Sequence, residues 1–418
     1  MNEKEIVEKI NLLLSYSEII ENGWLDRGKG TLNYSKYFED LEKSYNIYIG
    51  IEHIELYREL LFEIFKKGDI KDNYTIKTVA ERFNAFLIET KVRRGALKEP
   101  KFQKYLQNLI NAEKKKILVF HKIYGIDIQG NQPVDVGCFT FYKYSKHKKV
   151  IVKKTETTSV KVLLNHFAEF SKHDFWVSTE IEVVDKDKAQ ELAYRKFEAL
   201  QGIFQLLIDI KRLSTGHAIC ILNDINMHFD MCYMFSDSEK YSSFNNDLFR
   251  CENIEIEYFV NDKDGLLNSI ISKIFTSEKN EIHEKLINAF IAYSRTIYEY
   301  SNAQKFVLFT TAIEALIGRD VTSLSKNISK WFSAMICRTQ DVYESMKKDF
   351  DAHYNIRCEI SHGSRVTVLE DDTKFARAYA AELIMSFLLD ENILSLRKTK
   401  ELEYYLDKKV KDFEESNT

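Results

Sequence analysis

The residues best suited to chemistry in this 418-residue chain lie in the segment Phe350–Gly363. At 100° per residue, Arg357 lies on the same helix face as Phe350, and Tyr354 lies about 40° away. Phe350 continues an apolar stripe, so Arg357 emerges from the apolar side of its helix. An unpaired charge buried there would cost several kcal/mol. Arg357 is therefore expected to pair with an acid or to face a cleft.

His362 lies about 140° further round the helix, where Gly363 is expected to end it. At a helix C-terminus the negative end of the dipole favours an imidazolium, and Glu359 could add to this effect. Such a histidine can take a proton from a ribose 2′-oxygen or give one to a leaving 5′-oxygen. The planar fork of Arg357 suits the phosphate oxygens between them. The pair is suited to cleaving RNA without a metal ion, and the alternative is a buried Arg–Glu pair with a helix-capping histidine.

Cys358 and Glu314 each need a separate interpretation. Cys358 and His362 are four residues apart and resemble a thiol–imidazole dyad, but the sequence shows no orienting carboxamide or oxyanion loop, which favours Cys358 as a small packing residue. Glu314 sits inside an apolar helix, where a carboxylate needs a partner. Glu314 is expected to pair with Arg357 or with an upstream arginine, in a structural role.

Two stretches of the last third of the chain resemble one known family. Tyr354-Asn-Ile-Arg357-Cys-Glu-Ile-Ser-His362-Gly363 resembles the Tyr-x-x-Arg-x-x-x-x-His-Gly signature of Apea-like HEPN domains. Phe306–Gly318, with its embedded Ala-x-Glu-Ala-Leu, is similar to the first long helix of that family. The resemblance covers roughly residues 280–395. Many nuclease members have Asn, Asp or His directly after the arginine, where this chain has Cys358.

The resemblance implies a fold, an activity and an assembly. HEPN domains are helical bundles that usually dimerise, and many are metal-independent endoribonucleases of bacterial toxin and phage-defence (abortive infection) systems. It implies that Arg357 and His362 are catalytic residues. It also implies that the two copies of each residue come together at the interface of a homodimer. The expected supporting residues are Tyr354, Glu359, Cys358, Gly363 and Glu314.

A lysine-rich segment, Phe141–Lys154, holds six lysines and no acid, interleaved with three aromatic residues. It is predicted to form a β-hairpin. The hairpin either binds RNA, with lysines contacting phosphates and aromatic rings stacking on bases, or it has a solvated lysine-rich edge that discourages aggregation. Residues 281–370 hold eleven basic and eleven acidic residues, so attraction of RNA is expected to depend on lysines elsewhere. The candidate RNA-binding residues are Lys143, Lys146, Lys148, Lys149, Lys153 and Lys154.

The hydrophobic pattern changes along the chain and predicts a multidomain α+β protein. Residues 1–115 are expected to be helical, and residues 116–265 to form an α+β sensing or regulatory domain. Residues 266–395 are expected to form a four-helix-type bundle, and the resemblance described above implies that this bundle is of the HEPN kind. Residues 396–418 alternate lysines with acids and are expected to be a solvated helix or a fraying end.

Individual elements follow from periodicity and from turn residues. A loop is predicted at Asn22–Tyr34, and strands at Ile117–Ile128, Val136–Tyr144, Lys149–Val152, Phe175–Val184 and Ile254–Val260. A helix capped by Asp185 or Asp187 is predicted to carry an apolar stripe from Ala189 to Leu207. The first bundle helix is predicted to run through Phe306–Leu316 and to end at Gly318. A second helix is predicted to end at Ile336, and two more are predicted through Tyr343–Ser361 and Phe375–Leu389.

Composition narrows the class of protein. The 60 Lys+Arg against 64 Asp+Glu give a net charge of −4, which excludes a protein held to nucleic acid by bulk positive charge. Two prolines and fourteen glycines favour long helices. The six cysteines include no Cys-x-x-Cys, and no metal site or cofactor is expected. No signal peptide or membrane span is seen, so we expect a soluble cytoplasmic protein with reduced thiols.

Two functions from different classes remain open at this point. In one, the first two regions sense or restrain, and the bundle cuts RNA, with an unknown regulatory protein or phage trigger as a further partner. In the other, the bundle is a catalytically silent dimerisation and nucleotide-binding scaffold, and the protein is a sensor or adaptor. Activity after loss of Arg357 or His362 separates them.

Overall fold

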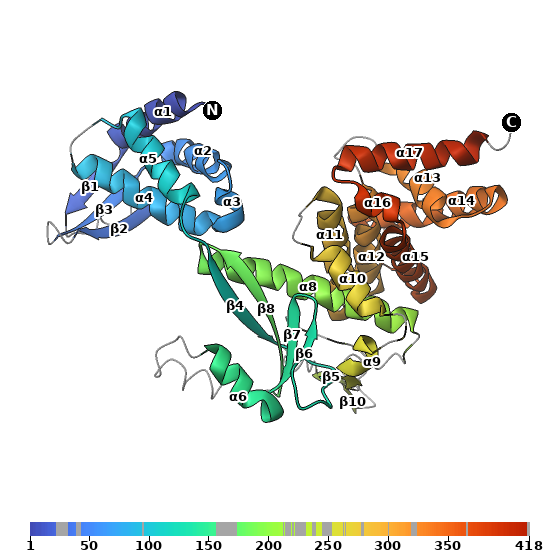
Figure 1. The fold of residues 1–418 in the computed structure, drawn as a ribbon. Helices are drawn as coiled ribbons and strands as arrows, with labels where there is room; N and C mark the ends of the chain where they lie inside the picture. Colours follow the sequence, from blue (N-terminus) through green and yellow to red (C-terminus); the bar gives the residue numbers. More distant parts are fainter. Residues whose placement is uncertain are drawn as a thin grey trace. The chain divides into compact units, whose positions relative to one another are not determined.

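The computed structural model describes residues 1–21, 32–38, 43–93, 96–155, 174–211, 231–235, 240–244, 253–261, 263, 265–276, 280–299, 301–318, 324–364 and 367–415, together with 213, 219 and 221. The chain divides into two compact units, Met1–Val119 with Glu180–Ala193, and Phe120–Thr179 with Tyr194–Thr418. Helices predominate, and a small sheet region lies in the middle of the chain (Figure 1). Among the helices described, none is both long and apolar enough to cross a lipid bilayer. The boundaries predicted after residues 115, 265 and 395 stay predictions.

The first unit contains helices and an antiparallel sheet. Its helices are α1 (Glu3–Tyr16), α2 (Ile54–Phe65), α3 (Ile70–Asn73), α4 (Ile76–Val92) and α5 (Glu99–Ile110), with a short 3₁₀ turn at Ile51–His53. Its strands, β1 (Glu18–Glu21), β2 (Leu32–Phe38) and β3 (Lys43–Ile49), pair in the order β1-β3-β2. The prediction of a helical region holds for α1 to α5 but missed the sheet, and the loop prediction was wrong from Leu32 onward. Tyrosine and isoleucine along β3 favour a strand, and Ile47 and Ile49 are buried in one apolar cluster with residues of the helices.

The apolar periodicity of the first unit forms its core. Tyr57, Phe83 and Leu87, on α2 and α4, are buried in one cluster with residues of α1, α5 and β3. Ile51 of the 3₁₀ turn and Phe62 of α2 are apolar but exposed. The buried face of this segment therefore covers only part of its apolar residues.

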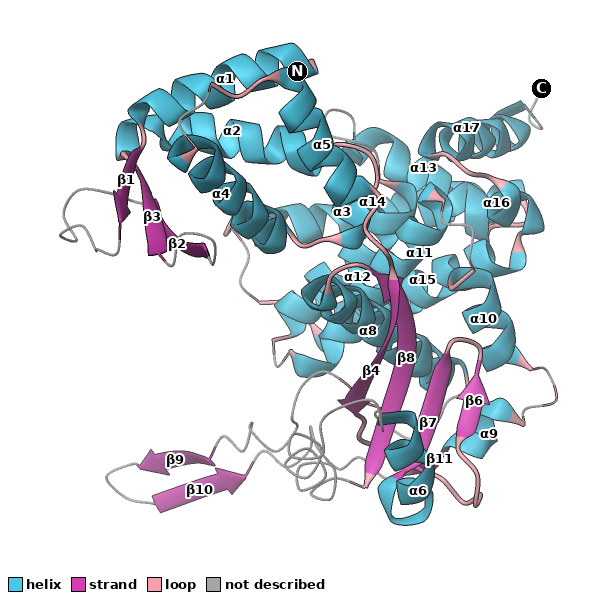
Figure 2. Ribbon diagram, turned by 60° about the vertical axis from the view of Figure 1, so that its left-hand side comes forward, coloured by secondary structure: helices cyan, strands magenta, loops and turns pink. Residues whose placement is uncertain are grey.

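The middle of the chain forms a four-stranded sheet in the order β4-β8-β7-β6 (Figure 2). Its strands are β4 (Lys115–Lys122), β8 (Phe175–Val183), β7 (Phe139–Lys143) and β6 (Val134–Val136). Two smaller pairs are β5 (Ile126–Asp127) with β11 (Ile254–Glu255), and β9 (Met231–Phe235) with β10 (Lys240–Phe244). Phe139 and Phe141 of β7 contact Phe197 and Phe204 of the long helix α8 (Lys186–Ile210), so this helix packs on the sheet.

Helix α8 begins at the predicted cap and lies against a helix of the C-terminal region. The carboxylate of Asp185 accepts a hydrogen bond from the backbone N–H of Asp187, which identifies Asp185 as the capping residue. A Cβ atom on Gly202 would collide with the backbone carbonyl of Phe290 on α11. Glycine at this position therefore allows the backbones of α8 and α11 to approach closely.

Two predicted strands in the middle region are helices. Lys149–Val152 lies inside α6 (Tyr144–Thr155), so the predicted lysine-rich hairpin does not form. Of the predicted strand Ile254–Val260, two residues form β11, and the rest form α9 (Ile256–Val260). The partner strand β5 is two residues long, so its pairing with this segment ends at Glu255.

The C-terminal region is helical, as predicted, and its helices lie together in Figure 1, coloured from yellow to red. They are α10 (Leu266–Ile274), α11 (Glu281–Arg295), a 3₁₀ turn (Thr296–Tyr298), α12 (Asn302–Ile317), α13 (Leu324–Ile336), α14 (Gln340–Ser361), α15 (Glu370–Leu389), α16 (Glu391–Ser395) and α17 (Thr399–Glu415). Helix α12 contacts α11, α14 and α15, and it ends at Gly318 as predicted.

The predicted charged tail is a packed helix. Leu402, Leu406 and Val410 of α17 are buried, and α17 packs against α13. The indole N–H of Trp331 on α13 donates to Asp407, with 2.8 Å between the two atoms. The expectation of a solvated or fraying end was wrong, because apolar residues at every fourth position were obscured by the charges between them.

Candidate functional site

The predicted motif lies on α14, whose end is fixed by backbone geometry. His362 is the C-cap, and Gly363 follows with a φ of 73°, in the left-handed region that favours glycine. The N–H of Gly363 donates to the carbonyl of Ile360 (3.0 Å), and the N–H of Ser364 donates to that of Glu359 (2.9 Å). This pair of bonds is a Schellman motif. It ends the helix directly beside His362.

Arg357 is held by an acid from another helix. Its Nη2 lies 3.0 Å from Oε2 of Glu314 on α12, and the hydroxyl of Tyr354 donates to Oε1 of the same carboxylate at 2.7 Å. The Glu314 side chain is 16% exposed and that of Arg357 is 28% exposed. Burial, and then the hydrogen bond to Glu314, raise the pKa of Tyr354. The predicted Arg357–Glu314 pair is confirmed, and Tyr354 completes a three-residue cluster.

Glu314 leaves part of the Arg357 guanidinium available. Both carboxylate oxygens of Glu314 are occupied, one by Arg357 and one by Tyr354. The Nε of Arg357 is buried and has no hydrogen-bond partner among the described residues. Glu314 thus fixes the arginine head through Nη2, and an anion that reached the site would find further N–H donors.

His362 is exposed, and within one chain it lies apart from the Arg357 cluster. Five residues separate it from Arg357, which corresponds to about 7.5 Å along the helix axis and about 140° around it. Its backbone N–H donates to the carbonyl of Cys358, but no hydrogen bond joins the thiol and the imidazole in the described part of the chain. Cys358 is partly buried and free, and Glu359 is exposed.

A second histidine of α14 was missed by the sequence analysis. His353 precedes Arg357 by one helical turn, and its ring packs beside Phe306 and Tyr379. Its Nδ1 lies 2.9 Å from the carbonyl of Asp349, so Nδ1 carries the proton that this bond needs. Its Nε2 is buried without a hydrogen-bond partner among the described residues. The four-residue spacing to Arg357 was the available signal.

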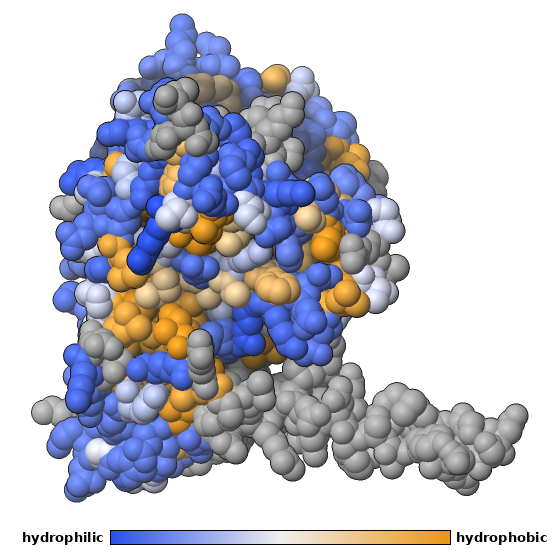
Figure 3. Space-filling view, turned by 90° about the vertical axis from the view of Figure 1, so that its right-hand side faces the viewer, coloured by the Kyte–Doolittle hydropathy of each residue, from blue (hydrophilic) through white to orange (hydrophobic). Residues whose placement is uncertain are grey.

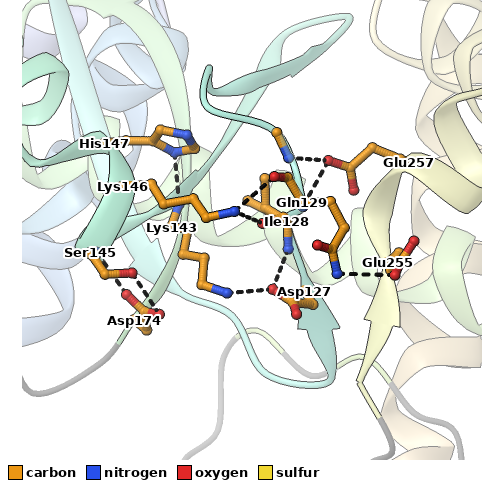
Figure 4. Close-up of polar contacts among 11 residues, drawn as sticks. Asp127, Ile128, Gln129, Lys143, Ser145, Lys146, His147, Asp174, Glu255 and Glu257 are labelled. Atoms are coloured by element: carbon orange, nitrogen blue, oxygen red, sulfur yellow. Dashed lines mark hydrogen bonds and ion pairs between the residues drawn. The ribbon is translucent and has the colours of Figure 1, made fainter.

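The lysine-rich segment is engaged with its own domain (Figure 4). Lys143 pairs with Asp127 at 2.7 Å, and Nζ of Lys146 donates to the carbonyl of Gln129 at 2.7 Å. Lys148 lies 5.9 Å from the centre of the Tyr144 ring. Lys148 and Lys149 are exposed. The side chains of Lys153 and Lys154 lie outside the described residues, and a role of the six lysines in RNA binding stays a prediction.

Capping explains why this segment forms the helix α6. The carboxylate of Asp174 accepts hydrogen bonds from the N–H and the hydroxyl of Ser145, and Nδ1 of His147 accepts one from the N–H of Lys143 (Figure 4). Asp174 thus satisfies one of the first N–H groups of the helix, and His147 binds the N–H of the residue that precedes it. Asp174 lies 29 residues from Ser145, so a reading of local propensity could not include it.

A second acid–arginine cluster, also missed, joins α8, α11 and α15. Nε of Arg377 donates to Oδ2 of Asp209 at 2.7 Å, and Nη2 of the same arginine donates to Oδ1. The hydroxyl of Tyr293 donates to Asp209 as well. Burial and the Asp209 charge hold the pKa of Tyr293 well above its usual value. This cluster ties the last turn of α8 to two helices of the C-terminal region.

Comparisons with known proteins leave the site to be interpreted from its own geometry. No family model matches the chain, and no match was found among the curated proteins or among the solved structures. The fold and the site define a mostly helical protein with an Arg–Glu–Tyr cluster near the end of α14. An exposed histidine caps that helix.

Proposed function

We propose that this chain is a metal-independent endoribonuclease of the HEPN type that acts as a homodimer in phage defence. The observation that supports it best is the arrangement of Arg357, which Glu314 fixes within one turn of Tyr354 and five residues before an exposed histidine. The resemblance of the motif to Apea-like HEPN domains supplies the class of activity and the biological role.

In the proposed reaction, the 2′-oxygen of a ribose attacks the adjacent phosphorus. The bond from O2′ to phosphorus forms and the bond from phosphorus to O5′ breaks, while the 2′-hydroxyl loses a proton and the leaving oxygen gains one. Arg357 holds the phosphate oxygens as negative charge develops on them. His362 moves one of the two protons, and Tyr354 with Glu314 orients Arg357. The products are a 2′,3′-cyclic phosphate and a 5′-hydroxyl.

The separation of Arg357 and His362 on one helix supports a site completed by a second copy of the chain. Apolar side chains reach the surface at the start of α15, where Leu369 is 65% exposed and Phe375 is 53% exposed. Figure 3 shows hydrophobic residues reaching the surface as a broken band between hydrophilic areas. A two-fold dimer that brings the ends of α14 together would cover apolar surface and supply both residue types to one cleft.

Cleavage is expected to continue in excess EDTA and to end with His362→Ala. Because His362 lies at an exposed helix end, its loss should remove a dipole interaction of about 0.3–1 kcal/mol and leave the melting temperature nearly unchanged. The assay is sequencing of RNA ends after incubation with purified protein, and after induced expression in cells. If EDTA stops cleavage and magnesium restores it, the metal-independent mechanism is wrong.

The same assay decides between the proposed enzyme and the alternative function. Glu391→Ala removes an exposed side chain from the short helix α16 and serves as the matched control, with cleavage expected at the wild-type rate. If the wild-type protein leaves RNA intact both after purification and in phage-infected cells that express it, the alternative of a catalytically silent scaffold is favoured instead.

The dimer has its own test. Light scattering of the full chain at micromolar concentration is expected to give twice the monomer mass of 49.2 kDa. Phe375→Glu should place a charge in the proposed interface and shift the mass toward the monomer, with cleavage falling in parallel. A wild-type monomer that still cuts RNA would contradict the shared site.

A further inference from the structure

The outer face of α17 carries three lysines around one exposed tyrosine. Lys400, Tyr404 and Lys408 follow one another at four-residue intervals, and Lys411 falls within about 20° of Tyr404 around the helix. The side chain of Tyr404 is 75% exposed, and the three lysines are exposed as well. The buried residues of α17 lie on the opposite side, against α13. The packing of the helix therefore fixes which residues face outward.

Three of the six acidic side chains of α17 accept hydrogen bonds or form an ion pair within the chain. The carboxylate of Glu401 accepts hydrogen bonds from two backbone N–H groups at the start of the helix, at 2.8 Å and 3.1 Å. Asp407 accepts from Trp331, and Glu414 pairs with Lys330 at 2.8 Å. Their negative charges are thereby partly neutralised by groups of the same chain.

The lysines of the outer face have no such partners. Lys400, Lys408 and Lys411 form no ion pair with any described residue, whereas Lys409, on another side of the helix, pairs with Asp390 at 3.4 Å. Although α17 as a whole contains more acids than lysines, its outer face presents three lysines without an ion pair among the described residues, and the acid of that face, Glu415, is the last residue of the helix. They flank the Tyr404 ring along about 12 Å of helix from Lys400 to Lys408.

A shallow depression of about 500 Å³ opens beside the exposed ring. It is lined by Leu396, Lys400, Glu401, Tyr404, Tyr405 and Lys408. The hydroxyl of Tyr405 is anchored to Asp390 at 2.6 Å, so that ring forms a fixed wall. Tyr404 has no such anchor among the described residues, and the face of its ring is available to a flat ligand.

We propose that this face of α17 binds single-stranded RNA. A base would stack on Tyr404, and the lysines would contact phosphates on either side. Aromatic rings set among lysines are the usual means by which proteins hold single strands, because every base offers a stacking face and every nucleotide a phosphate. Paired bases would not expose such a face, so a single strand fits better than a duplex. The choice of RNA over DNA rests on the proposed function.

The test uses the full chain carrying His362→Ala, so that RNA stays intact during the measurement. Fluorescence anisotropy with a labelled oligouridylate of about 20 nucleotides gives the Kd at several salt concentrations. Replacing Lys400, Lys408 and Lys411 together by alanine should raise the Kd at least about tenfold and lower the slope of log Kd against log salt by about 2. Tyr404→Ala should raise the Kd at least about fivefold, and Tyr404→Phe should leave it unchanged.

The matched control removes three other lysines that are exposed and have no ion pair among the described residues. Lys4, Lys71 and Lys104 replaced together by alanine change the net charge equally and should leave the Kd within about twofold. Equal loss in both triple variants would contradict the inference, as would a His362→Ala protein that does not bind the oligonucleotide. Cleavage is measured separately with His362 intact. Binding through α17 without cleavage would refute the nuclease alone, and cleavage with unchanged binding in the α17 variants would refute this surface alone.

Discussion

Arg357→Ala is expected to lower RNA cleavage at least about 100-fold and to destabilise the protein. The arginine supplies the donors proposed to hold the phosphate, and it also neutralises Glu314, a carboxylate that is 16% exposed. Without Arg357, that carboxylate would keep one oxygen bonded to Tyr354 and leave the other unpaired. The free energy of unfolding should fall by about 1–3 kcal/mol, measured by urea denaturation beside the cleavage assay.

Two further variants separate the loss of activity from the loss of stability. Adding Glu314→Gln to Arg357→Ala removes the stranded charge, so it should recover part of the stability and none of the activity. Arg357→Lys keeps a positive charge but loses the planar fork, and it should remain largely inactive. Full cleavage by Arg357→Lys would show that the site needs a charge and nothing more.

Asp209→Asn is expected to produce the largest loss of stability outside the motif. Asp209 is 14% exposed and accepts two bonds from Arg377 and one from the buried Tyr293. An amide at this position cannot accept all of these bonds, and it leaves the arginine without its acid. Arg377 is 42% exposed, so water offsets part of the cost, and we expect the free energy of unfolding to fall by about 2–3 kcal/mol.

The control for Asp209 lies on two of the same three helices. Glu198 of α8 pairs with Arg295 of α11 at 2.9 Å, but this arginine is 56% exposed. Glu198→Gln should therefore cost less than about 1 kcal/mol in the same denaturation experiment. Equal losses for Asp209→Asn and Glu198→Gln would show that the buried cluster contributes no more than a surface ion pair.

The sequence predicted those parts of the candidate site that can be recognised from the residues of a single helix. An acid inside an apolar helix needs a partner, and this rule identified Glu314 as a partner for Arg357. The glycine that ends α14 was recognisable from its position after the periodic residues. The same rule applied to Asp209, in the apolar end of α8, would have flagged it. Its partner Arg377 lies 168 residues away, and sequence spacing cannot identify such a contact.

The elements whose type was predicted wrongly depend on contacts with residues that are distant in the sequence. Lys149–Val152 has the β-branched residues of a strand, yet a cap from Asp174 starts a helix upstream of it. Ile254–Val260 alternates like a strand, but its partner β5 ends after two residues. Local propensity was outweighed in each case by whether a partner for the backbone exists.

The first unit contains two segments of the chain that are synthesised at different times. Its last piece is Glu180–Ala193, where the carboxylate of Asp185 accepts hydrogen bonds from the N–H and the hydroxyl of Thr75. The ribosome must therefore finish the first turns of α8 before that unit can fold completely, and His362 follows long afterwards. A nascent chain that stalls before α14 carries no motif, because α14 follows every residue of the first unit. The linear order of the chain thus places the motif of the proposed nuclease after the residues that complete the first unit.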